Sequence, residues 1–188
     1  RFCIASQGKV NIVLSPQFMV SCDTEDLGCR GGMLSNLWAF LIRKGTTTDT
    51  CYTYQSGKGN VPECSELAST CEDGNAMKLY KAKEAHTFSN IESIKAEIMV
   101  NGPVQTGFMV YKDFMTYKSG VYVQESQEFV GGHAVKIVGW GTENKVNFWK
   151  VANSCAPTCG ESRYFRIKQG NDNIDPNVMA GTPDLSTA

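Results

Sequence analysis

The sequence has 188 residues, a formal net charge of −1 and 41% hydrophobic residues, enough to bury a sizeable core as one domain or two small lobes. Charge is balanced and no basic or acidic block occurs, so the sequence lacks the electrostatic pattern of nucleic-acid or membrane-surface binding. The longest uninterrupted apolar run, at residues 37–42, is too short to span a bilayer. We therefore expect neither a nucleic acid nor a membrane as a partner.

Eight cysteines are an even and high number for this length. No C-x-x-C pair occurs, and the closest two are Cys155 and Cys159. The only histidines, His86 and His133, do not have zinc-ligand spacing, so we expect no metal and no cofactor. The remaining interpretation is a disulfide framework made in an oxidising compartment, which favours a secreted protein or one of a lysosome-like vacuole.

The first half of the chain has helical signals. Residues 1–11 have the character of the end of a helix. Ser15 and Pro16 then predict a short helix, because serine caps the first turn and proline fits within it. A longer helix is predicted over residues 33–44, where apolar side chains recur every three and four positions. Residues 46–83 are polar and irregular, so they need covalent tethers to hold their shape.

The second half of the chain is richer in strands. A capping box at residues 89–92 predicts a helix that ends before Gly102 and Pro103. Strands are predicted over residues 104–111, 120–124, 133–140, 148–153 and 163–168. Helices first and strands later indicate an α+β protein of two lobes. We divide it into a helical lobe with a disulfide-rich loop (1–85), a β-rich lobe (86–177) and a C-terminal strap (178–188).

One stretch of the β-rich half carries candidate chemistry. His133 follows two glycines on an apolar, β-branched run, and a polar turn at residues 142–145 leads into a second run that ends at Asn153. Alternation on both sides of a turn predicts a β-hairpin, which brings these two side chains together. An imidazole oriented by an amide is the base half of a Cys-His-Asn site. The alternative for His133 alone is an ordinary strand histidine in a core, and His86 is assigned no role.

Several short motifs resemble those of papain-family cysteine peptidases. They are GGHA at 131–134, GWG at 139–141, WKVANS at 149–154, CRGG at 29–32, NGPV at 101–104 and YKSGVY at 117–122. Together they resemble the cathepsin B-like branch from Arg1 to about residue 181. The resemblance implies a papain-like two-lobed fold, truncated at its N-terminus, with His133 as acid and base and Asn153 as its orienting group. It also implies protein or peptide substrates, and cystatin-like or propeptide inhibitors as partners.

The nucleophile of such enzymes is expected outside this sequence. It occupies a C-G-[SA]-C-[WY] motif about 130–150 residues before the histidine, which is between about position 3 and about 17 positions before residue 1. No such motif occurs here; Cys3 falls at the edge of this window and is the alternative nucleophile, although its context, RFCIA, is different. In the resemblance, Cys3 and Cys29 are structural cysteines whose partners precede residue 1. The glutamine and the N–H group of the oxyanion hole are expected there as well.

The resemblance also implies substrate contacts and disulfides. Gly31 and Gly32 match glycines that pair with an extended peptide. Leu34, Gly107 and Ala134 match the main specificity pocket, with Asp175 near its floor; a solvated loop aspartate is the alternative for Asp175. The implied disulfides are Cys22–Cys64 and Cys51–Cys71. No occluding loop with paired histidines lies between Cys51 and Cys71, which favours an endopeptidase over a carboxydipeptidase.

Two departures leave a second function open. The family has tryptophans where this chain has Cys155 and Cys159. Those indoles shield the histidine–asparagine contact from water, so we expect a weaker hydrogen bond without them. The two cysteines form a small local disulfide or reflect drift. The alternatives are therefore a cysteine endopeptidase, whose chain is inactive as given for want of the nucleophile, and an inactive secreted homologue that acts as a binding protein.

Overall fold

The structure is a computed structural model that describes residues 1–64 and 70–188; part of the stretch predicted to be irregular, residues 65–69, lies outside this description. The chain forms two compact units. The first comprises Arg1–Ala85 and Gly181–Ala188, and the second comprises His86–Ala180. The boundary at residue 85 is where the sequence analysis divides the chain, whereas the C-terminal segment joins the first unit at Gly181 rather than separating at residue 178. No helix in the described residues has the length and apolar composition of a membrane span.

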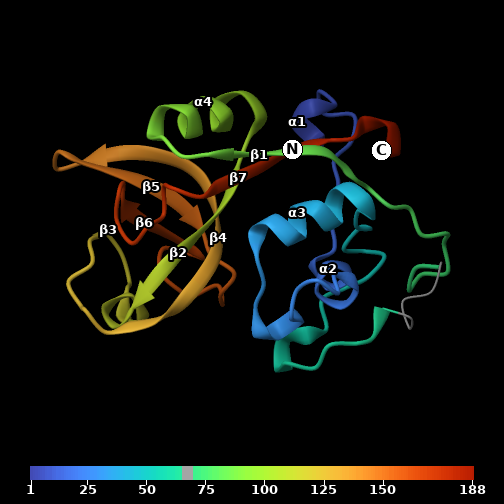
Figure 1. Ribbon diagram of the computed structural model, residues 1–188, viewed down its shortest axis with the longest axis horizontal. Coiled ribbons are helices and arrows are strands. Elements are labelled where there is room, and N and C mark those ends of the chain that lie inside the picture. Colours follow the sequence, from blue (N-terminus) through green and yellow to red (C-terminus); the bar gives the residue numbers. More distant parts are fainter. Residues whose placement is uncertain (65–69) are drawn as a thin grey trace. The chain divides into compact units, whose positions relative to one another are not determined.

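Helices α1 (Phe2–Ala5), α2 (Pro16–Cys22) and α3 (Leu34–Arg43) belong to the first unit (Figure 1). Helix α2 begins as its sequence predicts, because Ser15 Oγ accepts the Phe18 N–H at 3.0 Å and Pro16 occupies the first turn. The same hydroxyl donates to the Tyr52 carbonyl at 2.7 Å. Phe18 and Phe40 from α3 are buried in the core that these helices share with Tyr52.

Covalent and polar contacts hold the irregular part of the first unit. Disulfides join Cys22 to Cys64 and Cys51 to Cys71, the pairs that the resemblance implies. Buried Gln17 adds a polar anchor, since its Oε1 accepts the N–H groups of Gln55 and Ser56 at 2.8 and 3.0 Å. Short 3-10 helices, η1 (Gly28–Arg30), η2 (Ser56–Lys58) and η5 (Leu185–Thr187), complete this unit.

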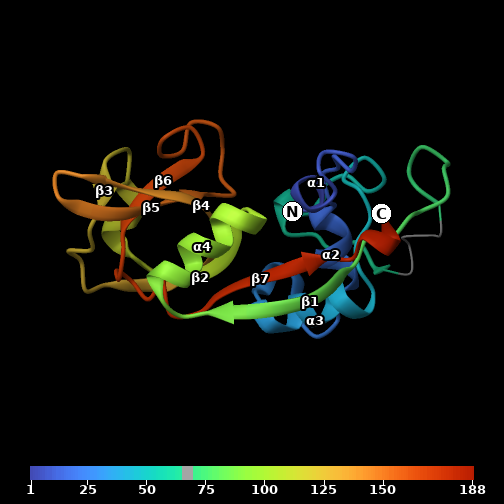
Figure 2. The ribbon, with the colours of Figure 1, turned by 90° about the horizontal axis from the view of Figure 1, so that it is seen from above.

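One sheet of order β1-β7-β2-β4-β5-β6-β3 organises the strands (Figures 1 and 2). Five strands lie wholly in the second unit: β2 (Val104–Tyr111), β3 (Val121–Tyr122), β4 (Phe129–Glu143), β5 (Val146–Ala152) and β6 (Tyr164–Lys168). Strands β1 (Ala82–Phe88) and β7 (Val178–Pro183) each carry the chain across the boundary between the units. Sequence analysis does not predict these two, because neither has a clear apolar–polar alternation.

The second unit has its own apolar core. Alternate residues of β2 are buried, and the same face of the sheet contributes Ile137, Trp149 and Ile167, each fully buried. Helix α4 (Ile91–Asn101) packs Ile94 into this core. Its cap is one residue later than the predicted box, because Asn90 Oδ1, not Ser89, accepts the Ser93 N–H at 2.8 Å. The 3-10 helix η4 (Lys112–Thr116) adds Phe114 against the core.

Strands β4 and β5 form the predicted hairpin, with an irregular register. Asn144 and Lys145 have φ angles of 49° and 66°, the left-handed pair that a tight type I′ turn requires. Ile137 faces Val151, but Gly139 faces Lys150, so Val138 is an extra residue in β4. Such a bulge shifts the alternation of faces by one residue on either side of it.

We predict that Ile94→Ala weakens the second unit by about 2–5 kcal/mol, because it empties a fully buried site in the core. Met99→Ala on the same helix is the matched control, since Met99 is 75% exposed, and it should change stability by less than about 0.5 kcal/mol. Amide hydrogen exchange in β4 and β5 measures both changes. Equal effects of the two substitutions would contradict this assignment of the core.

Candidate active site

His133 lies on β4 at the edge of the second unit's core. It faces Phe108 of β2 across the antiparallel ladder, and the two ring centroids are 5.9 Å apart. His133 shares the strand face of buried Val135 and Ile137 and is itself half-buried. Phe108 therefore covers one side of the imidazole while its edge stays accessible.

Asn153 follows the last residue of β5, and its side chain meets that of His133. The distance between His133 Nε2 and Asn153 Oδ1 is 2.8 Å. Lys136 pairs with Ala152, so the same register sets Asn153 beside Val135, on the face that carries His133. If Val138 instead paired regularly with Val151, every later pair would shift by one residue. Asn153 would then lie beside Lys136, on the opposite face. The bulge thus makes this contact possible.

The backbone of Ser154 fixes the direction of the hydrogen bond. Its N–H can only donate, and it donates to Asn153 Oδ1 at 2.9 Å. That oxygen is an acceptor, so His133 Nε2 must be the donor in the contact. In a neutral imidazole the other nitrogen, Nδ1, then carries the lone pair. In this arrangement Nδ1 is the ring nitrogen that can accept a hydrogen bond or a proton.

Two cysteines close the loop that follows Asn153. Cys155 and Cys159 form a disulfide, the first of the two alternatives that their spacing left open. The Asn153 Nδ2 donates to Cys159 Sγ at 3.9 Å, a weak contact on the other end of the carboxamide. The spacing of the cysteines suggests the disulfide, but nothing in the sequence predicts its contact with Asn153.

The residues matched to the specificity pocket in the second unit lie in two places. Gly107 and Ala134 face each other across β2 and β4, one position from the Phe108–His133 pair and on the opposite face. Asp175 is 8% exposed and accepts hydrogen bonds from the Trp149 indole and the Gly170 N–H. Both of its oxygens therefore have partners inside this unit, and its role at a pocket floor stays a prediction.

Gly31, Gly32 and Leu34 belong to the first unit, where a short turn precedes α3. Gly31 has a φ of +104° and open space where a Cβ would lie. A Cβ on Gly32 would fall 2.3 Å from Asp26 Cγ, so a side chain there would displace that of Asp26. Asp26 in turn accepts the Met33 N–H at 2.9 Å at the start of α3. The turn is also held by its own backbone, since the Gly31 carbonyl accepts the Leu27 N–H at 2.8 Å and the Gly31 N–H donates to the Gly28 carbonyl at 3.2 Å.

The second unit contains no free thiol. Its only cysteines, Cys155 and Cys159, are bonded to each other. Cys3 and Cys29 of the first unit are unpaired and exposed. In the described part of the chain, no three His, Cys, Asp or Glu side chains are placed to hold a metal ion. The second unit therefore brings His133 and Asn153 together without a free thiol.

Asp172 is a buried carboxyl group that sequence analysis missed. It is 8% exposed, and its oxygens make no close hydrogen bond within the described residues, although the neighbouring Asn171 side chain partly offsets the effect of burial on its pKa. Burial raises its pKa from 3.8 to about 6, and the charge of Asp113 adds to the rise. It adopts a left-handed φ of 53°, and its carbonyl accepts the Met109 N–H at 2.9 Å. An aspartate within a polar loop offers no sequence signal of such burial.

Comparison with known proteins agrees with this geometry. The profile of the papain family cysteine proteases matches residues 1–182, and the chain belongs to this family. Cathepsin B-like CP3 of Giardia intestinalis is 43% identical over 190 residues, covering 96% of this chain and 62% of that protein. Cathepsin B of Dictyostelium discoideum is 34% identical, covering 97% of this chain and 62% of its own length.

The similarity to solved structures gives the same branch. The structure matches procathepsin B S9 from Trypanosoma congolense with a TM-score of 0.90 and 32% identity. The match covers 98% of this chain and 65% of that one. The chain is therefore a papain-like α+β protein of the cathepsin B-like branch that spans less than two thirds of the length of these relatives.

We predict that Asp172→Asn stabilises the second unit near neutral pH but not in acid. The folded-state pKa, about 6, lies above the ordinary 3.8, so Asp172 contributes stability that is complete below about pH 3.8 and lost as pH rises through 6. Asparagine removes the charge and tolerates the left-handed backbone. Hydrogen exchange in β2 and β4 should show a gain of up to about 3 kcal/mol near pH 7 and little gain near pH 3.5. An equal gain at both values would contradict the charge argument.

Proposed function

We propose that this chain is the larger part of a cathepsin B-like cysteine endopeptidase. Its thiol nucleophile is supplied by sequence that precedes Arg1, together with the oxyanion hole. His133 accepts the thiol proton at Nδ1 and returns it to the leaving amine, and Asn153 orients the ring. The observation that carries the proposal is the 2.8 Å contact between His133 Nε2 and Asn153 Oδ1.

The assignment of the proton supports this division of roles. Because the Ser154 N–H makes Asn153 Oδ1 an acceptor, Nε2 keeps its proton and Nδ1 is left for the thiol. A thiolate beside the resulting imidazolium is a nucleophile at ordinary pH. The second unit has no free thiol, so the nucleophile for His133 has to come from outside this unit.

The substrate in this proposal is an extended peptide. Gly31 and Gly32 are the glycines matched to strand addition, and Gly32 is the one proposed to supply backbone groups, since the carbonyl of Gly31 accepts the Leu27 N–H and its N–H donates to Gly28. Leu34 of the first unit, and Gly107 and Ala134 of the second, are the residues that the resemblance assigns to substrate side-chain specificity. Asp175 is the weakest of the assignments, since its oxygens already bind Trp149 and Gly170. Cystatin-like proteins or a propeptide are the expected inhibitors, and the disulfides fit a secreted protein or one of a lysosome-like vacuole.

The test is to restore the missing half of the site. The chain is extended at Arg1 with the segment that precedes the matched region in Cathepsin B-like CP3, and hydrolysis of a fluorogenic peptide is measured. We expect hydrolysis by the extended chain, a loss of roughly 100-fold or more in kcat/KM with His133→Ala, and no hydrolysis by the 188-residue chain. His86→Ala, which changes the other histidine, is the matched control and should leave the rate unchanged.

A labelling experiment separates the alternatives. The 188-residue chain is treated with an electrophilic epoxide probe for cysteine peptidases, and adducts are mapped by mass spectrometry. A His133-dependent adduct at Cys3 would mean that the nucleophile is Cys3 of this chain and not a thiol that precedes Arg1. A folded extended chain that binds peptides but neither hydrolyses them nor takes the label would instead favour the inactive, secreted binding protein.

A further inference from the structure

The loop from Asn153 to Arg163 is closed on itself between β5 and β6. The Asn153 N–H donates to the Arg163 carbonyl at 2.8 Å, and the Arg163 N–H donates to the Cys159 carbonyl at 2.9 Å. The Cys155–Cys159 disulfide joins the two sides of the same loop. Asn153 therefore stands at the base of a cross-linked loop rather than at the end of a free one.

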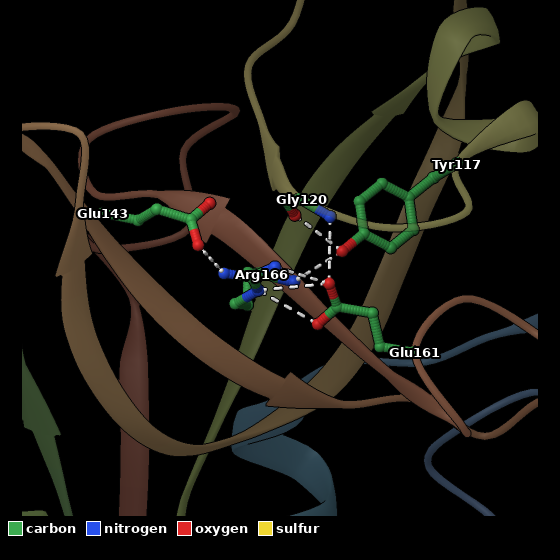
Figure 3. Close-up of polar contacts among 5 residues, drawn as sticks. All are labelled: Tyr117, Gly120, Glu143, Glu161 and Arg166. Carbon is green, nitrogen blue, oxygen red and sulfur yellow. Dashed lines mark hydrogen bonds and ion pairs between the residues drawn. The ribbon is translucent and has the colours of Figure 1, made fainter.

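An ion-pair network fixes the far side of this loop to the sheet (Figure 3). Arg166 of β6 donates to Glu161 through Nε at 3.0 and 3.1 Å and through Nη2 at 2.7 Å, and its Nη1 contacts Glu143 at 2.8 Å. Glu161 also accepts the Gly120 N–H at 2.9 Å, and Tyr117 donates to the Gly120 carbonyl at 2.7 Å. Hydrogen bonds from Arg166 lower the pKa of Glu161, so its stabilising charge is lost only as pH falls through that lowered value. The anchor thus persists in mildly acidic media.

The sulfur of Cys159 meets the carboxamide that serves His133. Asn153 Oδ1 receives two N–H groups, from His133 and Ser154, while Nδ2 points at Cys159 Sγ. A half-turn of the carboxamide would set its NH2 group against both donors and its oxygen against the sulfur. Contacts at both ends of the carboxamide therefore specify its orientation, and the disulfide supplies one of them.

We infer that the Cys155–Cys159 disulfide is a positioning element that keeps Asn153 Oδ1 turned toward His133. It does so by holding Cys159 Sγ beside Asn153 Nδ2 and by preventing the loop from carrying Asn153 away from the ring. The inference deepens the proposed function, and only its consequence for catalysis rests on that function. Its structural consequence is that the proton of neutral His133 stays on Nε2.

The proton position on His133 is the property that tests this role. Only two histidines occur in the chain, so ¹⁵N-labelled histidine gives two imidazole spin systems, with His86 as an internal reference. Spectra are taken at about pH 8, where imidazoles are ordinarily neutral. We expect the Nε2–H form to dominate at His133, and its ratio to the Nδ1–H form to fall roughly two- to tenfold in C155S/C159S, the range for loss of one hydrogen bond.

A double-mutant cycle shows whether the disulfide acts through Asn153. Asn153→Ala should lower the ratio at least as far, and adding C155S/C159S to that variant should lower it no further. C51S/C71S, which removes a disulfide from the other unit, is the matched control and should leave the ratio unchanged. An unchanged ratio in C155S/C159S, or an equal fall in C51S/C71S, would overturn the inference.

Folding of the variants is read from the same samples. Backbone amide signals outside residues 153–163 should keep their positions in C155S/C159S. C155A/C159A takes its place if the serine variant does not fold, with the same expected fall. If neither variant folds, the disulfide is required for folding of the unit, and the inference that it acts by positioning Asn153 is overturned. None of these measurements needs a substrate, so a chain without peptidase activity can still bear out the positioning role, and an active one can still contradict it.

Discussion

The register of the β4–β5 hairpin is the constraint on which the site depends. Side chains alternate between the faces of a sheet, so a shift of one residue moves a side chain to the other face. The extra residue Val138 supplies that shift between the tight turn and His133. Trp149 and Val151 then remain in the core while Asn153 reaches the histidine. The burial of these two apolar residues therefore keeps the hydrogen bond in place, because a slip would expose them.

A second level of organisation joins the site to β6. The loop after Asn153 returns to the sheet through Glu161 and Arg166, and Arg166 also reaches Glu143 at the end of β4. One half-buried guanidinium on β6 thus connects the end of β4 with the loop that follows β5. Hydrogen-bonded charge pairs of this kind tie together segments that are distant in the chain more than they add net stability.

Periodicity and capping signals predicted what depends on local sequence. The hairpin, α2 and the second-unit strands follow from alternation and from side chains that cap their own helices. The cap of α4 shows the limit, because Ser89 and Asn90 are both good caps and their identities alone do not select Asn90, the residue that caps the helix. Strands β1 and β7 form through partners remote in sequence, and the burial of Asp172 depends on the tertiary fold. The bulge at Val138 lies in a β-branched run whose sequence is equally suited to a regular strand and to a bulged one.

The same distinction explains why the contact between His133 and Asn153 forms within this unit. His133 and Asn153 lie at one hairpin that packs into the core of the second unit, and the loop that follows supplies the Ser154 N–H and one sulfur to the asparagine. A thiolate beside His133 would add a charge to this pair, but it would not be needed to align the histidine with the asparagine. The tryptophans expected at positions 155 and 159 would have shielded the pair by apolar cover, whereas the disulfide restrains it covalently. Shielding strengthens a hydrogen bond by excluding water, while restraint lowers the entropy cost of keeping its groups aligned. The two devices serve one contact by different physical means, so replacing the indoles by cysteines is compatible with a histidine that remains oriented.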